Sequence, residues 1–149
     1  MKKLVFIYII LFILSCKKQS STPNILVDFE KSYAISHEIK SNILIITISL
    51  KNNYHAYALG ERIGKPIGLE IIPEHGWAAA GPLTMPPGQS KKLSSLGPSQ
   101  ILEGTFSLSR PIKIGTQKGK ALLHMQICTD TACDRPRTHE INLLGNTLR

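Results

Sequence analysis

Short apolar runs, separated by turns rich in glycine, proline and asparagine, follow one another along most of this chain. The strongest run covers residues 42–51 (NILIITISLK), where isoleucine and threonine, both typical of strands, dominate. No stretch keeps the apolar period of about 3.6 residues that a helix requires. Strand-length runs with turn residues about every 8–12 positions predict an all-β fold, an antiparallel β-sandwich.

The other runs complete this pattern. Further strands are expected over residues 25–30, 32–39, 54–59, 69–72, 101–114 and 120–127, and a last one ending at residues 141–144. Pro111 either interrupts its run or marks an edge strand, because proline has no N–H to donate. Residues 73–98 are dense in proline and glycine, which predicts a functional loop or a poorly ordered segment. Trp77, within it, is expected to pack.

The first residues indicate export. Lys2 and Lys3 precede an apolar stretch at residues 4–14, which is too short to span a bilayer comfortably. Residues 13–16 (ILSC) resemble a bacterial lipoprotein signal, in which the cysteine is acylated. We therefore expect a signal peptide over 1–15, lipidation at Cys16, a flexible tether over 16–24 and one folded domain over 25–145. An export signal without lipidation is the alternative.

The charge of the chain fits this location. The formal net charge is +8, and its basic residues are scattered. Lys17 and Lys18 would lie beside the acyl chains, where basic residues favour anionic lipid headgroups. We therefore expect a lipid-anchored protein of the cell envelope that faces the periplasm and binds no nucleic acid.

The exported part holds two cysteines, Cys128 and Cys133, with four residues between them. An apolar run before them and a strand-like run after them predict a β-hairpin with a four-residue loop. The two cysteines then face each other at a Cα separation of about 4.5–5.5 Å, which suits a disulfide. A bond closing about six residues adds only roughly 2 kcal/mol of stability, so a chemical role is favoured over a structural one. Export places the pair where disulfides persist.

Three features together resemble the N-terminal domain of the DsbD-type thiol–disulfide interchange proteins. They are Gln126-x-Cys128, Cys133 followed shortly by Pro136, and the upstream triplet His55-Ala56-Tyr57. The similarity runs over most of residues 27–144. It implies an immunoglobulin-like sandwich without a cofactor. It also implies an electron carrier of the thiol–disulfide oxidoreductase type, which takes electrons from a thioredoxin-like or membrane-embedded thiol protein and gives them to oxidised periplasmic proteins.

The resemblance also implies a site. By position, Cys128 and Cys133 are the redox pair, with Cys133 favoured as the exposed one, and His55 and Tyr57 line the site, with Gln126 and Pro136 beside the pair. A cap loop shields the pair in this family. Residues 83–96 occupy that position and contain neither an acidic nor an aromatic residue.

One further departure from the family and one acid complete this picture. The best-known members continue into transmembrane and thioredoxin-like domains, so for this sequence the donor is expected to be a separate protein. Glu61 is the acid nearest in sequence to the strand of His55 and Tyr57. The alternative for His55 is a polar strand residue at a sheet surface, and the alternative for Tyr57 is packing in the core or on the sheet.

A metal site is the competing interpretation, because His124, Cys128, Cys133 and His139 superficially resemble a Cys/His cluster. In the predicted hairpin His124 faces Arg137 and lies about 13 Å along the strand from Cys128, so a shared metal shell is not expected. A copper- or zinc-carrying lipoprotein and a structural lipoprotein with an inert disulfide remain as alternative functions.

Overall fold

The computed structural model describes residues 29–94 and 97–144. Outside these residues lie the predicted signal peptide, Cys16 and the tether. The first four residues of the strand expected at 25–30 also lie outside, and residues 29 and 30 belong to a short 3-10 helix, η1 (Phe29–Lys31), rather than to a strand. The strands are β1 (Tyr33–Lys40), β2 (Ile43–Leu50), β3 (His55–Tyr57), β4 (Gly68–Ile71), β5 (Ala78–Ala79), β6 (Gln89–Ser94), β7 (Gly97–Glu103), β8 (Thr105–Lys113), β9 (Gly119–Met125), β10 (Ile127–Cys128) and β11 (Arg137–Leu143). Among the described residues, no helix is long and apolar enough to cross a membrane.

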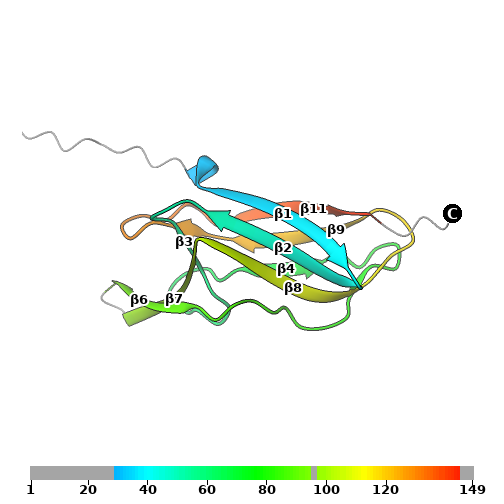
Figure 1. Ribbon diagram of the computed structural model, residues 1–149, viewed down its shortest axis with the longest axis horizontal. Helices are drawn as coiled ribbons and strands as arrows, with labels where there is room; N and C mark the ends of the chain where they lie inside the picture. The colour runs from blue at the N-terminus through cyan, green and yellow to red at the C-terminus, as the bar shows by residue number, and fades with distance from the viewer. Residues whose placement is uncertain (1–28, 95–96, 145–149) are drawn as a thin grey trace, which may run out of the picture.

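The strands form three antiparallel sheets, ordered β1-β2-β8-β5, β11-β9-β4 and β10-β3-β7-β6. The first two are the layers of a sandwich, with β1, β2 and β8 in front of β4, β9 and β11 in Figure 1. The third sheet, called the end sheet below, lies at the left end in that view. There it adjoins the orange loop that joins β9 to β11.

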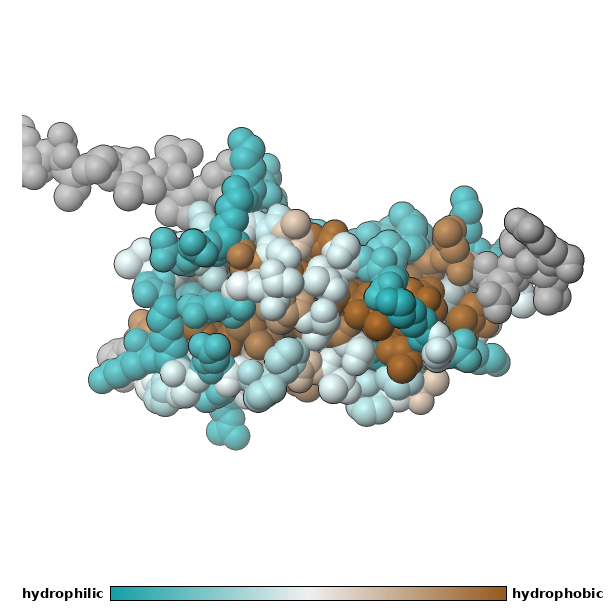
Figure 2. Space-filling model, viewed as in Figure 1, coloured by the Kyte–Doolittle hydropathy of each residue, from teal (hydrophilic) through white to brown (hydrophobic). Residues whose placement is uncertain are grey.

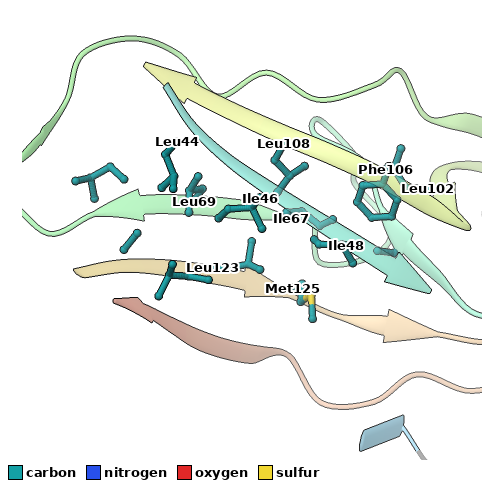
Figure 3. Close-up of a cluster of buried hydrophobic side chains, with 14 of the residues drawn as sticks. Leu44, Ile46, Ile48, Ile67, Leu69, Leu102, Phe106, Leu108, Leu123 and Met125 are labelled. Atoms are coloured by element: carbon teal, nitrogen blue, oxygen red, sulfur yellow. The ribbon is translucent and has the colours of Figure 1, made fainter. Parts of the chain in front are cut away.

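Side-chain alternation along β2 builds the core between the layers. Leu44, Ile46 and Ile48 are fully buried, while the residues between them are partly exposed. Their side chains meet Leu69 and Leu123 from the opposite layer (Figure 3). Each such side chain contributes about 1.5–3 kcal/mol by leaving water, so the alternating pattern fixes which face of β2 points inward.

The structure corrects two strand predictions. The run 101–114 is two strands, because Gly104 has a φ of 66° and ends β7 before β8 begins. Pro111 neither interrupts β8 nor marks a sheet edge, since β8 lies between β2 and β5. The Pro111 carbonyl still accepts the Ala80 N–H at 2.8 Å.

The region 73–98 contains two strands, β5 and β6, and packs through Trp77. This side chain is 1 % exposed, and its Nε1–H donates to the Gln117 carbonyl at 2.8 Å. A Cβ atom on Gly115 or Gly119 would lie 2.3 Å from the indole, so the ring needs glycine at both positions. Trp77 therefore fills the core near the start of β9.

Candidate redox site

The end sheet has two chemically different faces. Strand β3 lies between β10 and β7, and all three of its residues are buried. Ala56, at its centre, packs into the main core together with Leu102 and Ile127. Because neighbouring residues of a strand point to opposite faces, His55 and Tyr57 point away from that core.

This second face, called the site face below, carries the disulfide. Tyr57, Ile101 and Cys128 form a separate buried cluster on it. His55 is paired directly with Cys128 in the ladder between β3 and β10, so the two side chains share the face. The structure therefore brings together the predicted pair, His55 and Tyr57.

The disulfide closes a tight loop. Cys128 and Cys133 are bonded with their Cα atoms 4.0 Å apart. Between them the Thr129 N–H donates to the Ala132 carbonyl at 2.7 Å, and the Thr129 hydroxyl accepts the Ala132 N–H at 3.1 Å. Thr129 thus satisfies the backbone of the loop and keeps the second cysteine next to the first.

The two sulfur atoms differ in access. Cys128 is fully buried, whereas Cys133 is exposed, as expected from the resemblance. The Tyr57 hydroxyl lies 3.9 Å from the Cys133 sulfur. A protein that attacks this bond from solvent therefore reaches Cys133.

The hairpin register differs from the prediction by one residue. His124 faces Thr138 rather than Arg137, and its Nδ1 lies 2.9 Å from the Thr138 hydroxyl oxygen. The shift arises because the two arms differ in length between the Cys128–Cys133 pair and the Met125–Arg137 pair. The N-terminal arm has two residues there, and the C-terminal arm has three. Within residues 29–94 and 97–144, no three His, Cys, Asp or Glu side chains group so as to hold a metal ion.

Gln126 stands where the chain passes from β9 to β10, and it holds two loops together. Its Oε1 accepts the Lys65 N–H at 3.1 Å, and its Nε2–H donates to the Asp134 carbonyl at 3.0 Å. Pro136 is exposed and, with Lys65, lines a hollow of about 570 Å³ beside the cysteine loop. Gln126 therefore fixes the position of the cysteine loop, and Pro136 belongs to the surface around it.

The loop over residues 60–66 covers Tyr57. A Cβ atom built on Gly64 would lie 2.0 Å from the Tyr57 ring, so the Gly64 backbone sits directly on that ring. Glu61 anchors the start of the loop by accepting the N–H groups of Arg62, Ile63 and Gln100.

Burial alone would raise the pKa of Glu61, but three backbone N–H donors outweigh it and lower the pKa below its ordinary value. Burial, followed by the charge of Glu61, raises the pKa of Tyr57. Glu61 is therefore an ionised anchor of the loop, and Tyr57 keeps its proton at neutral pH.

Part of the predicted cap reaches the site. Residues 89–94 of the range 83–96 are strand β6, and Leu93 packs against the buried cluster of Tyr57, Ile101 and Cys128. Ser95 and Leu96 lie outside the described residues.

An ion-paired trio adjoins this strand. The Lys91 ammonium group lies 3.1 Å from a Glu103 carboxylate oxygen and 3.0 Å from one of Asp130, which is in the cysteine loop. The molecular end at which β6 and β7 lie is largely hydrophilic on the face seen in Figure 2. The Lys91–Asp130 ion pair therefore links β6 to the cysteine loop.

His55 is an unusual polar residue of the site face. It is 1 % exposed, and neither ring nitrogen has a hydrogen-bond partner among the described residues. Its ring packs edge-on against Tyr57 at a centroid distance of 5.6 Å. Burial and then the charge of Lys91 lower the pKa of His55, while Asp130 and Glu103 act in the opposite direction. The imidazole is therefore neutral at neutral pH.

Residues 23–145 match the family model described as thiol:disulfide interchange protein DsbD, N-terminal. The chain belongs to this family. No curated protein sequence matches it. The resemblance predicted from the sequence is confirmed, and so is the fold class, an immunoglobulin-like antiparallel β-sandwich.

Three solved structures share the fold. The reduced DsbD N-terminal domain of Neisseria meningitidis aligns with a TM-score of 0.65 at 19% identity, over 85% of this chain and 95% of that one. The same domain in complex with the PilB N-terminal domain gives 0.63 at 18%, over 83% and 91%. The N-terminal periplasmic domain of ScsB from Proteus mirabilis gives 0.51 at 11%, over 74% and 44%.

The charges that flank the cysteines of this DsbD N-terminal domain largely neutralise one another. Asp130 pairs with Lys91, and Arg137 pairs with Asp134 and Glu30. A positive charge beside a thiol lowers its pKa and makes it more reactive. Asp130, Asp134 and Arg137, which flank the cysteines, are therefore all ion-paired.

Sequence reasoning missed three contributors to this DsbD-type site. Gly64 gave no signal beyond a glycine-rich loop, and Lys91 lies in a polar stretch without strand alternation. Ile101 was recognised only as part of a strand. Ile101 could have been placed on the site face only from the pairing of β3 with β7, in which Tyr57 lies opposite Ile101.

Proposed function

We propose that this domain is a thiol–disulfide exchange module that relays reducing equivalents through Cys128 and Cys133 to oxidised exported proteins. One observation carries the proposal: a short-range disulfide presents one exposed cysteine, Cys133, and keeps the other, Cys128, buried. Membership of the DsbD N-terminal family supports exchange chemistry for the pair.

The exchange proceeds through mixed disulfides. A donor thiolate attacks the Cys133 sulfur, the Cys128–Cys133 bond breaks, and Cys128 leaves with the electron pair. A second donor thiol then displaces Cys133 and leaves the domain with two thiols. In the delivering direction, the Cys133 thiolate attacks an oxidised protein, and Cys128 then attacks Cys133, which restores the bond and releases the protein with two thiols.

The comparisons support partners of protein size in the cell envelope. A related domain is described in complex with the PilB N-terminal domain, and another is described as periplasmic. For this chain we propose a thioredoxin-like or membrane-embedded thiol donor, and attachment to the membrane through a lipid on Cys16. In this arrangement residues 16–24 are a tether and the folded domain extends over residues 25–145.

Serine variants of the two cysteines test the proposal. Cys128→Ser and Cys133→Ser are both expected to fold, because the bond adds only roughly 2 kcal/mol, and both lose electron transfer. Cys128→Ser, which keeps the exposed thiol, accumulates a mixed disulfide with a thiol protein of the envelope, whereas Cys133→Ser does not. Cys16→Ser is the control, since it releases the protein from the membrane and leaves exchange intact.

Redox titration against glutathione or dithiothreitol gives an independent measurement. The expected potential is more oxidising than about −300 mV, below which inert structural disulfides lie. A native bond that resists millimolar dithiothreitol, or unfolding of both serine variants, contradicts the proposal.

A further inference from the structure

Delivery of electrons by this domain requires Cys128 to lose a proton in a dry environment. After Cys133 has formed a mixed disulfide, Cys128 has to become a thiolate before it can attack. The side chain is fully buried, and burial disfavours the charged form of a thiol. A base within the site is therefore needed to make this step fast.

The acidic groups and the tyrosine of the site are already engaged. The Glu61 carboxylate accepts three backbone N–H groups. Asp130 and Glu103 both pair with the Lys91 ammonium group. Tyr57 keeps its proton because burial raises its pKa, and its hydroxyl contacts Cys133.

His55 differs from all of these groups. Both of its ring nitrogens lack a hydrogen-bond partner within the described part of the chain, although the side chain is 1 % exposed. It stands directly opposite Cys128 in the ladder, where paired Cβ atoms lie roughly 4.5–5.5 Å apart. The ring makes no hydrogen bond within the described part of the oxidised domain, so no existing bond is lost when a ring nitrogen meets the reduced Cys128 thiol.

We propose that His55 is the base that takes the proton of Cys128 when this cysteine resolves a mixed disulfide, an inference that rests on the proposed function. The Cys128 proton passes to a His55 ring nitrogen, and the sulfur attacks Cys133. The bond between Cys133 and the partner breaks, and the partner leaves as a thiolate. The imidazolium then returns its proton to that thiolate or to water, so the domain ends with a disulfide and the partner with two thiols.

The charges around His55 suit this task. Lys91 from β6 opposes an imidazolium, whereas Glu103 from β7 and Asp130 from the cysteine loop favour it. Tyr57, on the same strand, faces the ring as a neutral phenol, and Cys128 from β10 is the proton donor. The two carboxylates therefore offset part of the opposition from Lys91 when the imidazole is transiently positive. Burial lowers the pKa of His55, which keeps it ready as a base in the resting state.

The test separates the two chemical steps with one probe, 5,5′-dithiobis(2-nitrobenzoate), on reduced chains that also carry Cys16→Ser. Attack by Cys133 releases the first coloured thiolate, and resolution by Cys128 releases the second. His55→Gln is expected to leave the first phase within about two-fold and to slow the second about 10²-fold, the lower range for loss of a general base. His139→Gln is the matched control, because His139 also packs edge-on against a tyrosine and burial also lowers its pKa.

The pH profile of the second phase decides the matter even if His55→Gln folds poorly. In the wild type, the rate of the second phase should be constant from about pH 6.5 to 8, the range between the pKa values of histidine and cysteine. Without a base, the rate of this phase should instead rise about ten-fold per pH unit, because only the Cys128 thiolate reacts. A wild-type rate that rises steadily, or a His55→Gln variant whose second phase is unchanged or slows only as much as the first, overturns the role of His55. A wild type that never releases the second thiolate contradicts the proposed function itself.

Discussion

Replacing Gly64 by alanine tests how the site is covered. The new methyl group would lie 2.0 Å from the Tyr57 ring, more than an ångström inside normal contact. The loop has little freedom to withdraw, because the Lys65 N–H is bound by Gln126 and the Ile67 N–H donates to the Tyr57 carbonyl at 3.0 Å. Tyr57 is equally confined, with 6 % exposure.

Overpacking of this kind costs about 1–3 kcal/mol. Urea unfolding followed by circular dichroism measures the cost for the oxidised chain, and Gly68→Ala is the matched control. A Cβ atom on Gly68 meets its nearest neighbour at 3.9 Å, an ordinary contact. We expect Gly64→Ala to be less stable than wild type and its Cys133 to react at a changed rate, because Tyr57 is displaced.

A double-mutant cycle identifies the contact responsible. In a Tyr57→Ala background, the obstructing ring is absent, so Gly64→Ala should lose most of its cost. If Gly64→Ala is as stable as Gly68→Ala, or costs the same with and without the Tyr57 ring, the loop does not rest on Tyr57 as described.

Three further outcomes are expected. Glu61→Gln should be less stable than wild type at neutral pH. Because folding lowers the pKa of Glu61, the stability difference measured by urea titration should shrink as the pH falls below 4.5, the ordinary pKa of a glutamate. A stability difference that stays constant with pH contradicts the anchor role. Lys91→Gln should raise the pKa of His55 in an NMR titration of the imidazole, because one nearby positive charge is lost. Asp130→Asn should lower that pKa further, and equal values in both variants would exclude the ion-paired trio as the cause.

The strands that alternate clearly could be predicted from the sequence. Residues 42–51 contain β2, since its buried positions recur every second residue and no tertiary information is needed to find them. Strand β6 (QSKKLS) carries no such alternation, and its structure depends on pairing with β7. A polar segment that is ordered only by its neighbour cannot be recognised from its own residues.

The site could be predicted in composition but not in geometry. The cysteine pair and the His55-Ala56-Tyr57 triplet are visible as sequence signatures, yet their registers depend on a local irregularity. One extra residue on the arm after Cys133 shifts the partner of His124 and lets the chain move from β9 into the end sheet. Such an irregularity stays invisible because a regular hairpin satisfies the same hydrophobic pattern.

The position of Trp77 makes the protein convenient for spectroscopy. It is the single tryptophan of the chain, and it packs against Gly119 at the start of β9. The cysteines follow the other end of that strand, roughly 20 Å away at 3.3 Å per residue. Disulfides quench indole fluorescence only at close range, so the emission of Trp77 reports unfolding and stays blind to the oxidation state. Trp77 fluorescence can therefore distinguish a reduced but folded domain from an unfolded one.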